Sequence, residues 1–435
     1  MSALAQVSAK VEGAIVTGSD VEERFFTDIV LERAGIPIYP FAPENVDHAD
    51  LVVASAAYNE TNVEIARAHE LQIPVLSYPQ YLGRLMARKR GIAISGTHGK
   101  TTTTAMVGLV LIEAGIDPTI VVGSDVPSIG GNAYTGNGEY FLAESCEYRR
   151  HFLNYNPEYM VITNIEFDHP DYFKNLDDVI AAFNEFANKL PPHGRLFMWA
   201  EDPYRKAIRS TIPVTTFGLS SEADVQAVDI IFHNEGSSMR VLHHGEYIGH
   251  LHLHVAGRHN ILNALATIAL CSEMGIAAEQ ILDTLGRFNG TKRRFERVGS
   301  KDGALIMDDY AHHPTEIRTT LEGARLSFPQ RRIRAIFQPH TFSRTASLLE
   351  EFSHAFRSAD EVVVAEIFAS AREQDLSTTI SALALAELIQ KQGIKTRFFR
   401  SLDDIQTYVA DTLSPEDLVL TLGAGDVYKV GQGLV

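Results

Sequence analysis

The chain of 435 residues has few of the residues that build disulfide-rich or metal-clustered proteins: it contains two cysteines and one tryptophan. Cys146 and Cys271 lie far apart, and neither belongs to a paired metal-ligand spacing, so we expect neither a disulfide framework nor a zinc site. No apolar run approaches the roughly 18 residues that span a bilayer, and the N-terminus lacks the pattern of a signal peptide. These absences favour the reducing cytosol and argue against a membrane protein.

Positive charge is also scarce. Lysine and arginine number 38 against 55 acidic residues, which gives a net charge of −17 and disfavours binding to nucleic acid or to an anionic membrane surface. The composition is 45% hydrophobic and 21% charged, so the chain can bury real cores. At roughly 150 residues per domain, the length predicts about three domains.

What the sequence does contain is a long alternation of strand-like and helix-like runs, which is typical of parallel α/β sheets. In the first part, residues 1–5 are already helix-like. The runs that follow predict strands at 13–16 and 36–39, a buried strand at 50–55, and a helix at 21–34. A basic stretch at 84–90 marks the first expected boundary.

The central part predicts strands at 92–95, 140–144 and 160–164, and helices at 100–114 and 177–189. Between 224 and 255 the pattern changes to a period of two with glycine turns, which indicates an antiparallel appendage. Helices resume at Asn260 and a second break falls at 288–297. Beyond it, five strands are expected at 304–308, 333–337, 361–365, 396–399 and 418–422, separated by helices.

The strongest single feature is the glycine turn between the strand at 92–95 and the following helix, with the sequence Gly-Thr-His-Gly-Lys-Thr at residues 96–101. Glycines let backbone N–H groups approach phosphate oxygens, Lys100 offsets phosphate charge, and the Thr101 hydroxyl is a ligand for magnesium. The spacing is shorter than that of the common phosphate loop. The alternative is a glycine-rich turn that binds nothing.

Polar residues follow two further predicted strands. Glu144 ends one strand, and His169 follows the other closely, so both side chains are expected at the ligand-facing edge near the phosphate loop. Carboxylate oxygens there suit a magnesium ion that bridges phosphates. Taken singly, each is better explained as a surface carboxylate or a hydrogen-bonded core histidine, but their shared position at strand ends reverses that weighting.

Other polar segments begin or end predicted elements. The segment at 257–260 with Asn263 begins a helix, where Asn260 is either an N-cap or a ligand contact. The basic cluster at 292–294 is placed to bring a guanidinium onto a γ-phosphate, or it is a solvated charge run. The strands that end near 308–314 and 338–344 put further polar residues on the ligand edge of the third domain.

Five histidines, at positions 243, 244, 250, 252 and 254, superficially suggest a metal site. His250, His252 and His254 alternate with Leu251 and Leu253 along one strand, however, so an exposed polar face is the better interpretation.

Together these motifs resemble the Mur ligase family. The resemblance rests on six segments, in order along nearly the whole chain: 96–103, 164–169, 257–260, 292–295, 309–312 and 337–340. Within the family it is to members that join L-alanine to UDP-N-acetylmuramate, and the run at 144–152 is similar to the form seen in Gram-positive bacteria.

The resemblance implies an α/β fold of three domains. These are a Rossmann-like domain for the UDP-sugar at 1–87, a central ATPase-type domain with a phosphate loop and antiparallel appendage at 88–294, and a Rossmann-like domain for the amino acid at 295–435. It also implies an ATP-dependent enzyme of peptidoglycan precursor synthesis that uses magnesium and activates the carboxylate as an acyl phosphate. His169 and His312 are both candidates for the base that acts on the amine.

The resemblance also assigns site residues. Catalytic roles fall to Lys100, His169, Arg294, His312 and Arg344. Nucleotide contacts fall to Gly96, Thr97, His98, Gly99, Lys100, Thr101, Thr102, His259, Asn260, Arg294 and Asp309, with the two residues at 259–260 near the adenine and Asp309 at the ribose. Substrate contacts fall to Ser19, Asp20, Ser55, His340 and Arg344, and magnesium ligands to Thr101, Glu144 and His169.

The chain departs from the family pattern in two places. Thr341 stands where many members have a second arginine. The family's first strand and its glycine-rich turn, which precede a Met-Ser-Ala-Leu-Ala segment, are absent because the sequence begins at that Met1, and we expect about fifteen to twenty further residues to be encoded upstream. The open alternatives are a ligase that adds a tripeptide to the same sugar nucleotide and an impaired paralogue that only binds nucleotide, while a regulatory switch is disfavoured because it would not need Glu144, His169 and Arg344.

Overall fold

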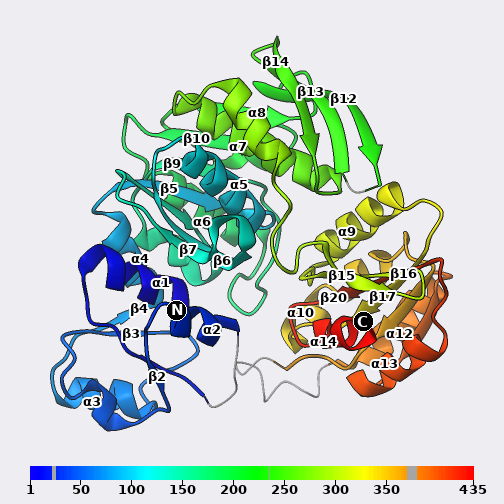
Figure 1. Cartoon of the computed structure of the whole chain (residues 1–435), viewed down its shortest axis with the longest axis horizontal. Coiled ribbons are helices and arrows are strands. Elements are labelled where there is room, and N and C mark those ends of the chain that lie inside the picture. The colour runs from blue at the N-terminus through cyan, green and yellow to red at the C-terminus, as the bar shows by residue number, and fades with distance from the viewer. Residues whose placement is uncertain (22–25, 235, 370–379) are drawn as a thin grey trace. The chain divides into compact units, whose positions relative to one another are not determined.

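The computed structural model describes residues 1–21, 26–234, 236–369 and 380–435, and it divides the chain into two compact units (Figure 1). Unit 1 comprises residues 1–165, 180–217 and 266–284. Unit 2 comprises residues 166–179, 218–265 and 285–435. Each unit is built on parallel β-strands with intervening helices, so the predicted α/β class is confirmed.

The first part of unit 1 contains short elements. They are α1 (Ser2–Val7), a π-helical turn (Ser8–Glu12), β1 (Gly18–Ser19), α2 (Phe26–Arg33), β2 (Ile38–Tyr39), β3 (Val52–Ala54), α3 (Val63–Glu70), β4 (Val75–Ser77) and α4 (Tyr78–Met86). The strands form two separate parallel pairs, β1 with β2 and β3 with β4. The helix-like start is therefore confirmed.

Two expectations for this region were wrong in detail, and a third is tested only in part. Residues 13–17 form no strand, the side chain of Ile15 is 100% exposed, and the strand begins only at Gly18. Strand β3 is half-buried rather than buried, because among the described residues it pairs only with β4. The expected helix at 21–34 is observed from Phe26, and its residues 22–25 lie outside the described residues.

The larger part of unit 1 is a mostly parallel sheet of long, buried strands. Its strands are β5 (Arg90–Ser95), β6 (Thr119–Val126), β7 (Gly131–Thr135), β8 (Tyr140–Glu144), β9 (Pro157–Ile162), β10 (Arg195–Trp199) and β11 (Val214–Gly218). Their order is β11-β10-β9-β5-β8-β6-β7, with only β7 antiparallel to its neighbour. Helix α5 (Lys100–Glu113) is buried throughout residues 101–111, which explains why it lacks an amphipathic pattern. Helix α6 (Leu176–Ala187) begins one residue before its expected start.

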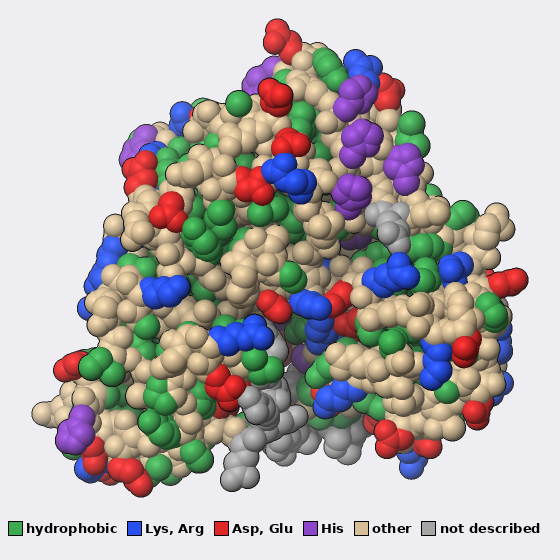
Figure 2. Space-filling model, viewed as in Figure 1, with side chains coloured by type: hydrophobic (Ala, Val, Ile, Leu, Met, Phe, Trp, Pro, Cys, Tyr) green, Lys and Arg blue, Asp and Glu red, His purple; other side chains and the backbone are tan. Residues whose placement is uncertain are grey.

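In unit 2, strands β12 (Val225–His233), β13 (Gly236–His243) and β14 (Glu246–Leu253) form antiparallel hairpins, as the period-two pattern predicted. His250 and His252 are exposed while Leu251 and Leu253 are buried, so the polar-face interpretation is confirmed. Figure 2 shows histidine side chains gathered over these hairpins. Helices α7 (Arg258–Glu273) and α8 (Ala278–Gly286) follow along the chain.

The C-terminal part of unit 2 is a six-stranded sheet of order β15-β16-β20-β17-β18-β19, in which only β15 is antiparallel. The strands are β15 (Glu296–Lys301), β16 (Ala304–Asp309), β17 (Arg332–Phe337), β18 (Glu361–Val364), β19 (Lys395–Phe398) and β20 (Asp417–Leu422). The helices are α9 (Pro314–Ser327), α10 (Phe342–Ser347), α11 (Leu349–His354), α12 (Ala382–Lys391), α13 (Leu402–Asp411) and α14 (Tyr428–Leu434). All five predicted strands are present, and β15 was missed.

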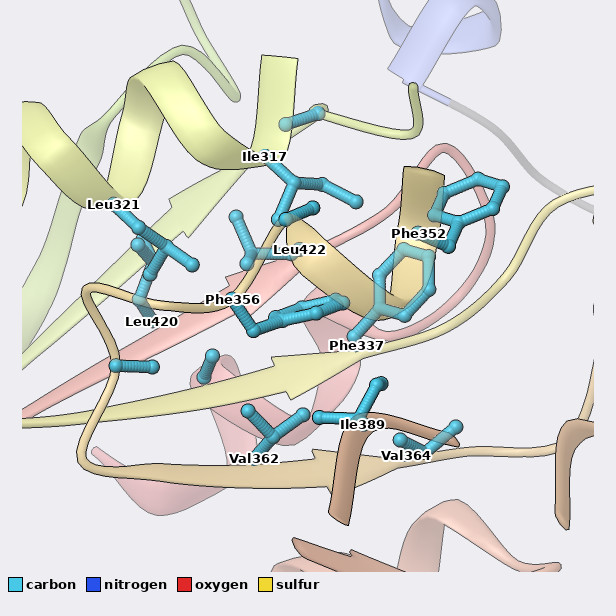
Figure 3. Packing of buried hydrophobic residues seen from close by; sticks show 14 of the residues in the cluster. Ile317, Leu321, Phe337, Phe352, Phe356, Val362, Val364, Ile389, Leu420 and Leu422 are labelled. Carbon is cyan, nitrogen blue, oxygen red and sulfur yellow. The ribbon is translucent and has the colours of Figure 1, made fainter. Parts of the chain in front are cut away.

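Alternate residues of these strands point to opposite faces, and each face has its own apolar core. Figure 3 shows one core, in which Phe337 of β17 packs against Phe352 and Phe356 with ring centroids 5.5 and 5.3 Å apart. The other face contributes Ile336 to a second core. Because both faces are covered, the loops at the carboxyl ends of the strands remain as the place for a ligand.

Candidate nucleotide-binding site

In unit 1, the phosphate loop joins the end of β5 to the start of α5. Gly96 has φ +124° and Gly99 has φ +82°, so both adopt backbone conformations that favour glycine. A Cβ atom on Gly96 would lie 2.0 Å from Thr163 Oγ1. The short spacing therefore forms a tight turn, and Gly96 is required sterically.

Asn164 holds this loop in place from the end of β9. Its Oδ1 accepts the His98 backbone N–H at 2.9 Å, its Nδ2 donates to the His98 carbonyl at 3.0 Å, and its own carbonyl accepts from the Thr97 N–H at 3.0 Å. The sequence motif included Asn164 but gave it no role. The structure assigns it the support of the loop.

Lys100 is held at the start of α5 by three acceptors. Its Nζ donates to the carbonyls of Gly96 at 2.6 Å and Thr97 at 2.8 Å, and it forms an ion pair with Glu147 Oε2 at 3.0 Å. Burial by itself would lower the pKa of Lys100, but the Glu147 carboxylate, with smaller effects from Cys146 and Glu144, raises it above its usual value. Lys100 is therefore cationic. Glu147 was missed as a functional residue, although its position just after β8 was the available signal.

Thr101 and Glu144 are brought together as predicted. Thr101 Oγ1 donates to the Glu144 carboxylate at 3.0 and 3.1 Å, and Glu144 Oε2 also accepts the Gly123 N–H at 2.8 Å. A hydroxyl and a carboxylate at the N-terminus of a helix are hard oxygen ligands beside a phosphate-binding loop. These two residues thus have the chemistry that a divalent cation requires. Thr97 and Thr102, two further residues of the predicted phosphate-binding segment, are also buried.

The residues assigned to the sugar nucleotide are half-buried at the ends of β1 and β3. Ser19 Oγ accepts from Asn45 Nδ2 at 3.3 Å, Asp20 Oδ1 accepts from the Tyr58 hydroxyl at 3.4 Å, and Ser55 Oγ accepts from the Ala57 N–H at 3.3 Å. These contacts all lie within the first sixty residues of the chain, and the substrate role of the three residues stays a prediction.

Unit 2 holds the other predicted nucleotide residues. Asp309, at the end of β16, accepts the backbone N–H groups of Phe295 at 2.8 Å and Ala311 at 2.7 Å. Burial raises the pKa of Asp309 to about 6, against the lowering effect of Arg294. The Arg294 guanidinium lies 5.2 Å from the Tyr310 ring centroid and 3.9 Å from Glu316 Oε1.

The start of α7 resolves one alternative that the sequence left open. The helix begins at Arg258, and the Asn260 amide donates to the Ala256 carbonyl at 2.7 Å, so N-capping by Asn260 is wrong. Asn263 Nδ2 in turn donates to Asn260 Oδ1 at 3.2 Å. Among the described residues, the buried Nδ1 of His259 has no hydrogen-bond partner. Burial and then Arg294 lower the pKa of His259 to about 4, so its ring is neutral.

The basic cluster at 292–294 divides into different roles. Arg293 Nε pairs with Asp308 at 3.0 Å and Nη2 donates to the Gly423 carbonyl at 2.7 Å, so Arg293 stabilises the domain itself. Lys292 pairs with Glu296. Arg294 is the residue of this cluster whose charge acts on two residues assigned to the nucleotide, His259 and Asp309.

A second polar group lies at the ends of β16 and β17. His312 Nδ1 lies 3.0 Å from the Tyr310 carbonyl and 3.3 Å from Glu316 Oε2, and burial lowers the pKa of His312 to about 3. The His340 ring stacks on Phe368 with centroids 5.5 Å apart. The His312 and His340 ring centroids are 6.0 Å apart, so the predicted substrate residues of this domain gather at one edge.

Arg344 and Asp168 complete this group. Arg344 Nε donates to Asp168 Oδ1 at 2.9 Å, and the same oxygen accepts the His169 N–H at 2.6 Å. Burial by itself would raise the pKa of Asp168, but Arg344 and the nearby histidines hold it well below its usual value. His169 has φ +57°, an uncommon conformation for a residue other than glycine. Its predicted role as a magnesium ligand stays a prediction.

A parallel α/β sheet with a glycine loop, Lys100, Thr101 and a strand-end carboxylate defines a nucleotide-phosphate-binding protein. Family models for the Mur ligase family catalytic domain, the Mur ligase middle domain and the Mur ligase glutamate ligase domain match residues 1–90, 94–271 and 293–425. The chain belongs to the Mur ligase family.

Individual relatives agree with these matches. The chain is 71% identical over 435 residues to the UDP-N-acetylmuramate--L-alanine ligase of Desulfitobacterium hafniense, covering 100% of this chain and 97% of that protein. It is similar in structure to the UDP-N-acetylmuramate-alanine ligase of Thermotoga maritima, with a TM-score of 0.84, 30% identity and coverage of 100% and 95% of the two chains. The murein peptide ligase of Psychrobacter arcticus matches with a TM-score of 0.73, 26% identity and the same coverage.

None of the described helices is long and apolar enough to cross a membrane.

Proposed function

We propose that this chain is an ATP-dependent ligase that joins L-alanine to the carboxylate of UDP-N-acetylmuramate during peptidoglycan precursor synthesis in the cytoplasm. The observation that carries this proposal is the 71% identity, over the whole chain, to a protein named for that reaction. The phosphate loop and the paired Thr101 and Glu144 support it, because they supply what phosphoryl transfer needs. We divide the chain at 1–87, 88–294 and 295–435, and the matched ranges support this division.

In the first step of the proposed reaction, a carboxylate oxygen of the sugar nucleotide attacks the γ-phosphorus of ATP, and ADP leaves. Both reactants are anionic, so Lys100 offsets their repulsion, and Arg294 adds positive charge at the γ-phosphate. When bound, Mg²⁺ would neutralise phosphate charge, and Thr101, Glu144 and His169 are the residues proposed to hold it. The product of this step is an acyl phosphate.

In the second step, the neutral alanine nitrogen attacks the acyl carbon, the bond to the phosphate oxygen breaks, and the proton that the nitrogen loses goes to the departing phosphate. We assign His312 to this end of the reaction. The Tyr310 carbonyl accepts at Nδ1, so the neutral ring presents Nε2 as an acceptor toward the amine. With its pKa lowered to about 3, His312 orients the amine rather than storing the proton.

The test is product formation with a panel of amine donors. The protein, UDP-N-acetylmuramate and MgATP are incubated with L-alanine, glycine, L-serine or the tripeptide of peptidoglycan, and the nucleotide product is identified by mass. We expect a product mass equal to the sum of UDP-N-acetylmuramate and alanine minus water, with ADP released over many turnovers only when the amine is present. Product with the tripeptide but not with alanine would favour the peptide-adding ligase. Nucleotide binding without any product would favour the impaired paralogue.

A further inference from the structure

The segment 166–168, which follows β9 along the chain, is bound by the C-terminal sheet's ligand edge within unit 2. Glu166 Oε1 accepts from Thr315 Oγ1 at 2.6 Å, and the Phe167 carbonyl lies 3.2 Å from His313 Nε2. The Phe167 ring packs against the apolar core shown in Figure 3. Asp168 adds the ion pair with Arg344. Three consecutive residues of a segment assigned by sequence to the central domain thus contact α9 and α10.

The ion pair of this segment is deeply buried and shares its acceptor atom. Asp168 is 6% exposed and Arg344 is 5% exposed. Asp168 Oδ1 accepts both Arg344 Nε and the His169 N–H, which fixes the carboxylate relative to the backbone. The Arg344 Nη1 atom lies 3.5 Å from His340 Nδ1. In the part of the chain that the structure describes, Nη2 of Arg344 has no hydrogen-bond partner.

A buried guanidinium that binds an anion must be neutralised before the ligand arrives and must present its donors in one direction. Pairing through Nε meets both needs, because it fixes the plane of the guanidinium and leaves terminal N–H groups for an incoming oxygen anion. Asparagine at position 168 would keep the shape but lose the charge that neutralises Arg344.

We propose that Asp168 is a positioning residue, which holds Arg344 ready for a carboxylate or phosphoryl oxygen of the substrate. This inference rests on the proposed function. Asp168 acts through Arg344 and through the docking of segment 166–168 on α9 and α10.

Steady-state kinetics of Asp168→Asn, Arg344→Lys and the double variant test the proposal. The Michaelis constant of each of the three substrates and kcat are measured, with thermal unfolding of every variant. Arg344→Lys identifies the substrate that Arg344 binds, because the Michaelis constant of that substrate should rise more than the other two. We expect Asp168→Asn to raise that same constant about tenfold and the other two less than about twofold. The double variant should be no worse than the poorer single variant within about a factor of three.

Asp171→Asn is the matched control, because Asp171 is exposed, lies three residues beyond Asp168 and attracts Arg344 more weakly than Asp168 does. It should leave all three constants unchanged. Asp168→Glu retains the charge, so it replaces Asp168→Asn if that variant does not fold. It should raise the same Michaelis constant, but to a smaller extent.

Multiplicative effects in the double variant, or a fall in kcat and unfolding temperature without a selective rise in one Michaelis constant, would overturn the positioning role. If the wild type ligates alanine and this pattern is absent, only the present inference fails. If the wild type forms no alanine product, the proposed function fails and this inference fails with it.

Discussion

Each cation assigned to an anionic ligand already has a carboxylate partner. Lys100 lies 3.0 Å from Glu147, Arg344 lies 2.9 Å from Asp168, and Arg294 lies 3.9 Å from Glu316. Such partners keep buried cations neutralised and oriented before a phosphate or carboxylate binds. None of these three carboxylates was given a role from the sequence. The fold brings each of them to its cation, and no fixed sequence spacing connects the two residues of such a pair.

Gly96 gives a steric test of the phosphate loop. Gly96→Ala combines φ +124° with a Cβ atom that would lie only 2.0 Å from Thr163 Oγ1, so we expect it to abolish ATP binding. Gly115→Ala is the matched control: its φ is +73°, but nothing lies within 4 Å of the added Cβ. This control should lose only about 1 kcal/mol of unfolding free energy and keep ATP binding. Calorimetric titration with ATP compares the ATP affinity of the two variants. Equal ATP affinity in Gly96→Ala and Gly115→Ala would contradict the assignment of the phosphate loop.

The raised pKa of Asp309 predicts that the contribution of this residue to kcat/KM for ATP depends on pH. Its pKa of about 6 in the folded state means that the carboxylate is charged above about pH 6 and becomes protonated below it. An ionised carboxylate accepts from ribose hydroxyls more strongly than an amide does. The ratio of kcat/KM for ATP between wild type and Asp309→Asn should therefore fall toward one as the pH drops below about 6. ATP titrates equally in both proteins, so a ratio independent of pH would count against this role.

At the scale of elements, the long buried strands were the most predictable. Strand β8 was predicted to the residue, and the C-terminal strands to within one residue at either end, because continuous apolar runs between turns are a strong signal. The first part of the chain was predicted least well. Its strands are two or three residues long, and the apolar residues at 14–16 that suggested a strand lie outside regular structure.

An arginine inside β17 shows a limit of pattern reading. Arg334 is 1% exposed, yet its charge is balanced by strand neighbours: Nη1 donates to Asp417 Oδ2 at 3.2 Å, and Nε lies 2.9 Å from Glu361 Oε2. Asp417 begins β20 and Glu361 begins β18, so the ion pairs link three parallel strands at their amino ends. A charge within an apolar run gives no indication of its partners until the strand order is known.

This arrangement predicts a large loss of stability on removing Arg334. Arg334→Met removes the buried cation shared by Asp417 and Glu361, which keep Arg332 and Lys395 as partners, so it should cost about 2 kcal/mol of unfolding free energy. Arg397→Met is the control, because Arg397 lies 4.0 Å from Glu361 but its side chain is 50% exposed, and it should cost less than about 0.5 kcal/mol. Denaturant unfolding compares them, and similar losses would show that the network contributes little.

At the scale of the whole molecule, a net charge of −17 belongs to a protein proposed to bind two anionic nucleotides. The positive charge proposed to bind these ligands is therefore local, at Lys100, Arg294 and Arg344, each next to a carboxylate that limits its reach. The fold class followed from the sequence, and so did the residues proposed for the site, because strands, turns and motif residues are local. The supporting contacts of Asn164, Glu147 and Asp168 required the structure.

The central claim is that the sugar carboxylate is activated by phosphoryl transfer and then receives alanine. UDP-N-acetylmuramate labelled with ¹⁸O in its carboxylate tests it directly, with MgATP and L-alanine as the other substrates. The account predicts that each turnover transfers one ¹⁸O atom to the released inorganic phosphate, because the attacking carboxylate oxygen leaves with the phosphoryl group. Alanine product formed with unlabelled phosphate, or with the label in AMP, would contradict it.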